Sequence, residues 1–400
     1  MSAIKQDHYK EGVMYTPFYN KQKAWDRVNK WHRWADYTVP DYLECVSKEY
    51  FAIRNSASIF DLTPMAKYRI KGPEALDFLN RMMVRDMTKV KVGRVAYSVW
   101  CDDDGQVIDD GTIFRFAEDE YLLCSQERQL EILQRNAIGF DVEFKEETDH
   151  IAAMAFQGPV TCRILKNMGL EGVEELKPFD LRYFDFEGTQ MMVSRTGYTG
   201  ELGYEIMAKP EKAEALWDAL MEAGKDYTVR PIGTDALEIA RIEAGFLLAG
   251  VDFACAHETI RPGHTRSPYE LGLDWLVKLD KGVVFNGRRA LMKEKAEGSR
   301  YRFVKLDVEG NKTACNAYLF DRKNGKTIGA VTSTVWGPSA KKNIAFGYVE
   351  MPHGNPGDHV WAEIYYQKEL KWNRVWAKCE VVDKPFWNPP RRSQTPPGDY

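Results

Sequence analysis

The 400-residue sequence lacks features that would point to a membrane or a nucleic acid as partner. No apolar run approaches the roughly 18–20 residues that a membrane-spanning helix needs. No block is rich in lysine and arginine, and the net charge is −4, so we expect no nucleic acid and no membrane as partner. Residues 1–10 are polar and lack the apolar core of a signal peptide. We therefore expect a cytoplasmic protein.

The sequence also has few residues suited to a metal site. Its seven cysteines are scattered, odd in number and never spaced as a Cys-x-x-Cys pair. That pattern is typical of reduced thiols and argues against structural zinc or an iron–sulfur cluster. His257 and His264 have Pro262 between them, so they do not form a metal pair on one helix. We expect no metal site.

Glycine, in contrast, is concentrated in residues 194–206, at positions 197, 200 and 203. Apolar runs on both sides predict a strand, a tight turn and a second strand. Glycine at this spacing permits a positive φ or gives a flat ligand room to approach. The alternative is a glycine-rich hairpin turn without a ligand. Glu205 favours the ligand, because a hairpin tip needs no second carboxylate on the strand that follows it.

Residues 71–82 align without gaps on residues 157–168, and each copy predicts a strand, a Gly-Pro turn and a helix. Helix chemistry alone can produce such a pattern, because proline is common near helix starts. We nevertheless favour the duplication of an α+β unit. Two related units packed together form a seam, and seams are where ligands tend to bind.

Two adjacent aspartates lie between the copies. Residues 95–101 and 107–114 predict two strands joined by an acidic turn, and Asp109 and Asp110 fall inside the second strand. Aspartate is disfavoured in strands, and adjacent strand residues face opposite ways. One of the pair therefore faces an interior, where a carboxylate usually needs a partner or a function.

The remaining sequence completes an α+β fold. Residues 1–58 are rich in aromatics and short helical periods. Two later segments, 210–223 and 237–246, have the apolar spacing of helices. Arg241 in the second of these helices is interpreted as structural. Five short segments predict the strands of a small β-barrel: 303–308, 327–334, 345–349, 359–366 and 374–382. We expect domains at 1–150, 151–285 and 286–384, followed by a Pro-rich tail at 385–400.

Five segments resemble the glycine-cleavage T-protein (aminomethyltransferase) family. They are SRTGYTGELGYE, VIDDGTI, ARIEAG, SPYELGLDWLVKLDKG and GKTIGAVTSTVWGPSAKKNIAFGYV. With related motifs they run in the family order from about residue 16 to about residue 387, nearly the whole chain. The resemblance implies three domains around a central channel, two related α+β units and a C-terminal barrel, and a one-carbon transferase that uses tetrahydrofolate.

The resemblance also implies roles for individual residues. Asp110 matches the essential aspartate of the family and Glu205 its pterin-binding glutamate. Four more residues match positions that line the folate channel or lie near the pterin and glutamyl ends: Met65, Tyr97, Tyr198 and Trp275. Physical chemistry supports the first two roles. One carboxylate can accept hydrogen bonds from the adjacent N–H groups of a reduced pterin, and a fixed anion stabilises positive charge that shifts during transfer to folate nitrogen.

The sequence departs from the family pattern at three places. Leu237 stands where T-proteins carry an arginine that contacts folate, and Ala236-Leu237 is similar to the folate domains of dimethylglycine- and sarcosine-type demethylating enzymes. Cys124-Ser125-Gln126 replaces Ser-Asn-Ala, and Thr63-Pro64 replaces Ser-His. These changes fall on the substrate side, so the one-carbon donor is expected to differ.

We therefore expect a tetrahydrofolate-dependent demethylase or methyltransferase. It would move a methyl group from a small O-, S- or N-methylated substrate to tetrahydrofolate and yield 5-methyl-tetrahydrofolate. The alternative is an aminomethyltransferase that takes its unit from a lipoyl-carrier protein and yields 5,10-methylene-tetrahydrofolate and ammonia. A non-enzymatic folate-binding protein of the iron–sulfur-repair type is disfavoured, because its Lys-Gly-Cys-Tyr-x-Gly-Gln segment is missing and Asp110 is retained.

Overall fold

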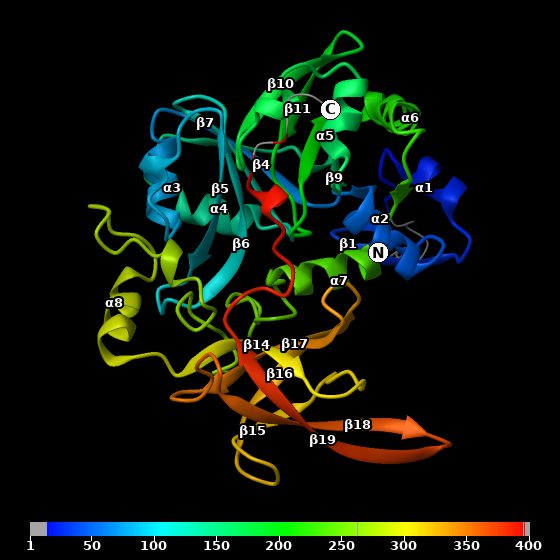
Figure 1. Ribbon diagram of the computed structural model, residues 1–400. Helices are drawn as coiled ribbons and strands as arrows, with labels where there is room; N and C mark the ends of the chain where they lie inside the picture. The colour runs from blue at the N-terminus through cyan, green and yellow to red at the C-terminus, as the bar shows by residue number, and fades with distance from the viewer. Residues whose placement is uncertain (1–13, 262, 395, 397–400) are drawn as a thin grey trace, which may run out of the picture.

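The computed structural model describes residues 14–261, 263–394 and 396. Residues 1–10, Pro262 and the last part of the Pro-rich tail, about which the sequence raised expectations, lie outside this range. The fold is α+β, with two α+β units side by side and a closed β-barrel below them (Figure 1). Within the described residues, no helix combines the length and apolar character needed to cross a membrane. The domain limits at residues 150, 285 and 384 stay predictions.

The first unit is built on a five-stranded sheet in the order β5-β6-β7-β4-β8. Its strands and helices are β4 (Ala66–Lys71), α3 (Ala75–Met82), η1 (Met87–Lys89), β5 (Arg94–Cys101), β6 (Val107–Arg115), β7 (Glu120–Ser125), α4 (Leu130–Asn136), β8 (Glu143–Glu146) and η2 (Thr148–His150). The strands predicted at 95–101 and 107–114 are β5 and β6.

The second unit is built on a six-stranded sheet in the order β10-β11-β12-β9-β3-β13. Its elements are β3 (Ala57–Asp61), β9 (Ala152–Gln157), α5 (Thr161–Asn167), η3 (Val173–Glu175), β10 (Leu181–Phe186), β11 (Thr189–Ser194), β12 (Gly203–Ala208), η4 (Pro210–Lys212), α6 (Ala213–Ala223) and β13 (Val229–Pro231). The helix predicted at 210–223 is therefore η4 followed by α6.

The two sequence copies fold alike. Each runs from a strand (β4 or β9) through a Gly-Pro turn into a helix (α3 or α5). Gly72 and Gly158 adopt nearly the same conformation, with φ of 140° and 144°, and a Cβ at either position would collide with a neighbouring backbone carbonyl oxygen. Only glycine fits both turns. The strand orders β5-β6-β7-β4 and β10-β11-β12-β9 also correspond, which supports the duplication.

The chain crosses between the two sheets twice. β3 directly precedes β4 in the sequence but pairs with β9 in the other sheet, so residues 62–65 form one crossing. β8 directly precedes β9 but pairs with β4, so residues 147–151 form the second crossing. The buried ammonium of Lys67 holds the first crossing, because it donates to the carbonyl oxygens of Thr63 and Met65 at 2.9 and 2.7 Å.

The N-terminal segment differs from its expected helical character. It contains α1 (Tyr19–Trp25), β1 (Lys30–Trp34), β2 (Tyr37–Tyr42) and α2 (Val46–Asn55). The helical expectation was wrong at 30–42, where β1 and β2 form a hairpin. Aromatic residues favour strands, and Ala35 and Asp36 take the positive φ angles, 43° and 77°, of a two-residue hairpin turn.

Among the described residues, three helical elements lie between β13 and the strands of the barrel. α7 (Thr234–Ala244) begins and ends earlier than the predicted 237–246. It ends at Ala244 because Gly245 takes a left-handed φ of 82° and caps the helix. It is followed by η5 (Asp274–Leu276) and α8 (Arg288–Glu297). Six strands close the predicted barrel: β14 (Tyr301–Val308), β15 (Tyr318–Phe320), β16 (Thr327–Gly337), β17 (Lys342–Glu350), β18 (His359–Lys368) and β19 (Lys371–Val382). β15 was not predicted.

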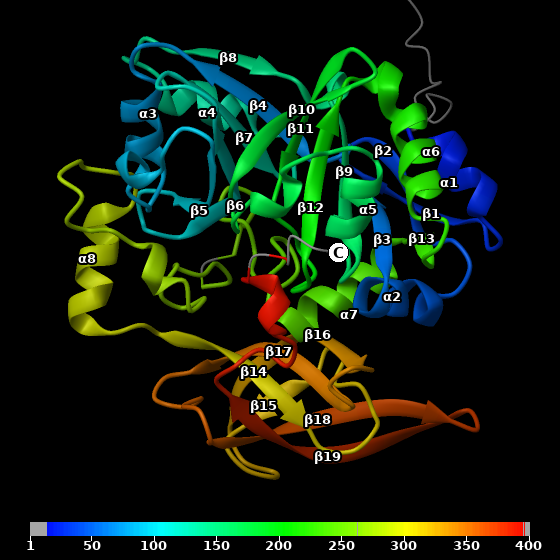
Figure 2. The same ribbon diagram turned by 45° about the horizontal axis from the view of Figure 1, so that its top comes forward.

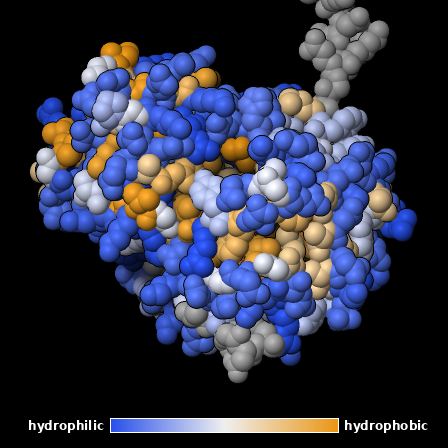
Figure 3. All heavy atoms as spheres, turned by 90° about the horizontal axis from the view of Figure 1, so that it is seen from above, coloured by the Kyte–Doolittle hydropathy of each residue, from blue (hydrophilic) through white to orange (hydrophobic). Residues whose placement is uncertain are grey.

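The C-terminal segment leaves the barrel after β19 and rises towards the two sheets, where η6 (Pro390–Arg392) lies (Figures 1 and 2). It therefore meets the seam between the α+β units. The face seen from above is largely hydrophilic, and apolar residues gather towards its middle (Figure 3).

The glycine-rich stretch forms the predicted hairpin, in which Ser194 pairs with Glu205. Its turn is not tight: a wide loop at 195–202, hereafter the glycine-rich loop, connects β11 and β12. The side chain of Gln157 lies inside this loop, where it donates to the carbonyl oxygens of Thr196 and Tyr204 at 3.1 and 3.2 Å. A Cβ on Gly197 or Gly203 would overlap Gln157. The room that these two glycines provide is thus occupied by a protein side chain.

We predict that Gly203→Ala lowers the free energy of unfolding by about 1–3 kcal/mol, the usual cost of overpacking, because the new methyl group overlaps the Gln157 side chain. Urea denaturation measures the change. Gln157→Ala removes the overlap, so the double variant should be less destabilised than the sum of the single variants. Additive effects of the two substitutions would contradict this packing explanation.

Candidate active site

A cavity of about 1190 Å³ lies between the two sheets, α7 and the barrel. All six residues predicted for the site line it, although they come from distant parts of the chain: Met65, Tyr97, Asp110, Tyr198, Glu205 and Trp275. They are carried by the first crossing, β5, β6, the glycine-rich loop, β12 and η5. The structure brings these side chains together in one cavity, while their roles stay predictions.

Asp110 lies on the wall formed by the first sheet. The Tyr97 hydroxyl on the neighbouring strand β5 donates to its carboxylate at 2.8 Å. Burial raises the pKa of Asp110, and the hydrogen bond from Tyr97 acts in the opposite direction. The carboxyl group is therefore held close to the range in which it can exchange a proton near neutral pH.

Asp109 faces away from the cavity and is buried, as expected for adjacent strand residues. It accepts hydrogen bonds from the backbone N–H of Asp110 at 2.8 Å and from the Gln129 amide. The indole of Trp100 donates to Gln129 Oε1 at 3.2 Å, which fixes the orientation of that amide. Burial and the nearby charge of Asp110 raise the pKa of Asp109.

Glu205 lies on the wall formed by the second sheet. One oxygen accepts a hydrogen bond from the Thr196 hydroxyl at 2.6 Å, and Thr196 also contacts the Ser194 hydroxyl at 2.7 Å. Among the described residues, no other hydrogen bond reaches this carboxylate. Burial raises the pKa of Glu205, and Thr196 partly offsets the effect. The other oxygen can therefore accept from a ligand.

Two aromatic residues and a buried arginine shape the cavity beside the glycine-rich loop. The Tyr198 hydroxyl donates to the carbonyl of Leu247, and its ring stacks on Phe246 with a centroid distance of 5.4 Å. Arg241 is fully buried and forms ion pairs with Asp252 and Glu238, both at 2.5 Å. These bonds support the interpretation of Arg241 as structural.

Two of the positions that depart from the family pattern use their hydroxyl groups in hydrogen bonds within the protein. The Ser125 hydroxyl donates to the Glu127 carbonyl at 2.9 Å, and the Thr63 hydroxyl donates to the Ala153 carbonyl at 3.3 Å. The cavity wall near these positions combines apolar and polar residues: Trp34, Phe60, Leu62, Met65 and Cys124 with His32, Arg33, Ser125, Gln126 and Glu127.

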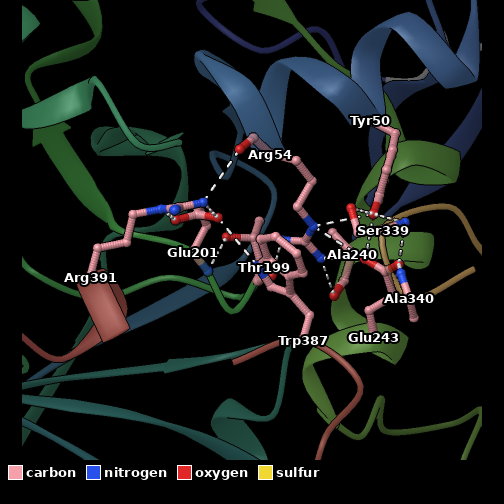
Figure 4. Close-up of polar contacts among 10 residues, drawn as sticks. All are labelled: Tyr50, Arg54, Thr199, Glu201, Ala240, Glu243, Ser339, Ala340, Trp387 and Arg391. Atoms are coloured by element: carbon pink, nitrogen blue, oxygen red, sulfur yellow. Dashed lines mark hydrogen bonds and ion pairs between the residues drawn. The ribbon is translucent and has the colours of Figure 1, made fainter. Parts of the chain in front are cut away.

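A buried ion pair joins the walls of the cavity (Figure 4). Arg54 on α2 pairs with Glu243 on α7 at 2.9 Å, and their side chains are 1% and 0% exposed. Glu243 also accepts from the Tyr50 hydroxyl at 2.5 Å and from the backbone N–H of Ser339 in the barrel at 3.1 Å. Arg54 donates to the carbonyl of Thr199 in the glycine-rich loop at 2.7 Å.

The C-terminal segment forms hydrogen bonds and an ion pair with the glycine-rich loop. Arg391 pairs with the buried carboxylate of Glu201 at 2.5 and 2.9 Å, and the Trp387 indole donates to it at 3.2 Å. Figure 4 shows Arg391 and Trp387 on either side of Glu201. Arg195 of the loop donates to the carbonyl of Arg391 at 3.3 Å. The loop therefore holds η6 against the cavity.

Sequence reasoning missed several residues that the structure brings to this region. Thr196 donates to the Glu205 carboxylate, Gln129 donates to Asp109 behind the cavity wall, and Arg392 lines the cavity from the far end of the chain. The alternation of β11 and β12 could have placed Thr196 near Glu205, but no local pattern predicts Gln129 or Arg392. Among the described residues, no group of three or more His, Cys, Asp or Glu could hold a metal ion, and all seven cysteines are free.

Comparison with known proteins assigns the family. Residues 14–281 match the GCVT N-terminal domain, and residues 302–388 match the glycine cleavage T-protein C-terminal barrel domain. The chain is 33% identical over 337 residues to an aminomethyltransferase of Halothermothrix orenii, in an alignment that covers 84% of this chain and 90% of that protein. It is 34% identical over 361 residues to an aminomethyltransferase of Caldanaerobacter subterraneus subsp. tengcongensis, with coverage of 88% and 91%.

A solved structure extends the similarity to three dimensions. The glycine cleavage system aminomethyltransferase T from Bartonella henselae superimposes with a TM-score of 0.80 at 26% identity, and the alignment covers 94% of this chain and 99% of that one. The protein described here thus shares its three-domain architecture with that aminomethyltransferase. It belongs to the glycine cleavage T-protein family. It is therefore an enzyme, a one-carbon-group transferase of a family that uses tetrahydrofolate.

The buried Asp110 carboxylate leads to a pH-dependent prediction. Because burial raises its pKa, the folded protein binds its proton more tightly than the unfolded chain, so stability is lost as the pH rises through the folded-state pKa. Asp110→Asn carries no charge at any pH. We expect it to raise the free energy of unfolding by about 1–2 kcal/mol at pH 7 and to abolish turnover.

The stability gain should shrink towards pH 4, where Asp110 is protonated in the folded protein. Denaturant titrations at pH 4 and pH 7 measure this gain in the free energy of unfolding. Asp103→Asn, in the exposed turn between β5 and β6, is the matched control and should change stability by less than about 0.5 kcal/mol. An equal gain at pH 4 and pH 7 would show that the carboxylate charge is not the cause.

Proposed function

We propose that the cavity binds tetrahydrofolate and that Glu205 binds its pterin ring. The observation that carries this proposal is one cavity with a carboxylate on each of two facing walls, the buried Glu205 on one and the half-buried Asp110 on the other. A reduced pterin presents an N–H and an amino group side by side, and the oxygen of Glu205 that Thr196 leaves free can accept from such donors. Thr196 fixes the carboxylate so that it needs no reorganisation on binding.

Asp110 acts at the transfer step in this proposal. Positive charge shifts at the folate nitrogen that accepts the one-carbon unit, and a carboxylate fixed by Tyr97 stabilises it. A raised pKa also suits Asp110 to take up a proton from that nitrogen. Met65, Tyr198 and Trp275 are proposed to position the ligand, because all three line the cavity.

We further propose that the unit transferred is aminomethyl, with 5,10-methylene-tetrahydrofolate and ammonia as products. Relatives named aminomethyltransferase support it over 84% and 88% of the chain. The donor would then be an aminomethyl group on a lipoyl-carrier protein, and the barrel and the α+β units would present the cavity to that partner in the cytoplasm.

A second candidate is demethylation of a small O-, S- or N-methylated substrate with formation of 5-methyl-tetrahydrofolate. The aromatic residues Trp34 and Phe60 in the wall favour it, as do the hydroxyl groups of Ser125 and Thr63, which already donate to backbone carbonyls. Such a wall suits a small methylated molecule better than the polar end of a carrier arm.

We predict that Glu205→Gln weakens tetrahydrofolate binding about 10- to 100-fold, the effect of losing charged hydrogen bonds. The glutamine oxygen can still accept from Thr196, so the fold should persist. Isothermal titration under anaerobic conditions gives the dissociation constant. Glu211→Gln, on the exposed start of η4–α6, is the matched control. An unchanged dissociation constant for Glu205→Gln would contradict the proposed contact.

Product analysis separates the two candidates. The purified protein is incubated with tetrahydrofolate and either an aminomethylated lipoyl carrier or a panel of methylated small molecules, and the folates are resolved by chromatography. We expect 5,10-methylene-tetrahydrofolate and ammonia from the carrier reaction, and neither product with Asp110→Asn. Formation of 5-methyl-tetrahydrofolate from a methylated small molecule, without a carrier reaction, would establish the second candidate instead.

A further inference from the structure

A second pocket, of about 510 Å³, is separate from the active-site cavity and lies where the two α+β units meet. Its charged residues are Arg85, Lys89, Lys91 and Arg94 of the first unit and Lys177 and Asp180 of the second. None of these six lines the active-site cavity. The pocket, hereafter the basic pocket, thus gathers five cations and one carboxylate in a chain whose net charge is −4.

The carboxylate of the basic pocket is already engaged within the protein. One oxygen of Asp180 accepts from the guanidinium of Arg94, with which it forms an ion pair. The other oxygen accepts from the backbone N–H of Lys177 at 2.8 Å. Asp180 therefore neutralises one of the five cations and leaves four positive charges in the pocket.

The other four cations, Arg85, Lys89, Lys91 and Lys177, form no ion pair with any residue that the structure describes. Arg85 is half-buried, and burial together with the like charge of Arg94 lowers its pKa. A half-buried cation without a counter-charge is costly, and repulsion between neighbouring cations adds to the cost. The pocket is therefore prepared for an anion.

Side chains from other parts of the first unit and from the segment before α8 hold one wall of the basic pocket. Arg115 donates to the carbonyl of Val90 at 2.7 Å, and the ammonium of Lys281 donates to the carbonyl of Arg85 at 3.0 Å. The guanidinium of Arg85 donates to the backbone carbonyl of Tyr97 on β5 at 3.0 Å. This bond uses one of its five N–H donors, so the guanidinium is positioned and can still bind a ligand.

Backbone pairing joins this wall to the wall from the second unit. The backbone N–H of Val95 donates to the carbonyl of Phe179 at 2.8 Å, and Arg94 and Asp180 pair in an isolated β-bridge. The backbones that carry the cations of the first unit and Lys177 of the second are therefore fixed relative to each other. An anion that contacts both walls would need no rearrangement of the chain.

We propose that the basic pocket binds a small anion that carries at least two phosphate groups and contacts both α+β units. The oxygens of a phosphate group match both the planar guanidinium of Arg85 and the ammonium groups of the lysines. Two or more phosphates supply the charge that four cations require, whereas one carboxylate does not. The volume lies within the roughly 300–1,000 Å³ of small-molecule sites. The site is independent of the proposed folate function.

Isothermal titration of the full-length protein at constant ionic strength tests the site with inorganic triphosphate, pyrophosphate, ADP, citrate and sulfate. We expect triphosphate and pyrophosphate to bind at least about 10-fold more tightly than citrate and sulfate, because they form additional charged hydrogen bonds. Tighter binding of ADP than of pyrophosphate would identify the ligand as a nucleotide, and the reverse order would identify a free polyphosphate; either order supports the site. Equal binding of all five anions, or of none, would overturn it.

Substitutions locate the binding. Arg85→Gln and the double variant Lys89→Gln, Lys91→Gln should each weaken triphosphate binding about 10-fold. Lys89 and Lys91 are exposed, so their double variant tests the site whether or not Arg85→Gln folds. The matched control, Arg322→Gln with Lys323→Gln, removes the same charge from exposed positions of the barrel and should bind as the wild type does. An equal loss in this control would show that net charge governs binding and would overturn the site.

Lys177→Gln tests the contribution of the second unit. It should weaken triphosphate binding about 10-fold and reduce the rise in melting temperature that triphosphate gives the wild type. Unchanged binding in this variant would overturn the contact with both units. Tetrahydrofolate binding should be the same in all the pocket variants as in the wild type, so a failure of this proposal leaves the folate function standing. A matching loss of tetrahydrofolate binding would overturn the separate site.

Discussion

The buried pair between Arg54 and Glu243 is the contact on which the cavity depends. It joins α2 to α7, the barrel through Ser339 and the glycine-rich loop through Thr199. Removing one partner of such a pair leaves an uncompensated buried charge, which typically costs about 3–5 kcal/mol. The walls that carry the two site carboxylates belong to different units, and this interaction fixes α7, the barrel and the glycine-rich loop beside the wall that carries Glu205.

The site itself works against stability. Asp110 and Glu205 are carboxylates in places where burial raises the pKa of each, and each has one hydroxyl donor from the protein, Tyr97 or Thr196. A fold optimised for stability alone would bury uncharged side chains there. Carboxylates in places that raise their pKa are often groups that interact with a ligand.

Much of this arrangement was predictable from local patterns in the sequence. The alternation around Asp109 and Asp110 predicts that one faces an interior, and the Gly-Pro turns predict two similar units. Tertiary packing overrode local signals elsewhere: the glycines at 197 and 203 suggested room for a ligand, but Gln157 fills that room. The fixed amide of Gln129 and the cation of Arg392 depend on contacts between segments far apart in the chain, so no local pattern encodes them.

The two crossings between the sheets govern the order in which the chain can fold. Ser58 on β3 bonds to the carbonyl of Gln157, 99 residues later, and β13 completes the other side of β3 only at Val229. A nascent chain therefore keeps β3 without its neighbours until the second unit has left the ribosome. Such long-range pairing slows folding, and the sheet that carries Glu205 can be completed only after the whole sheet that carries Asp110 has been synthesised.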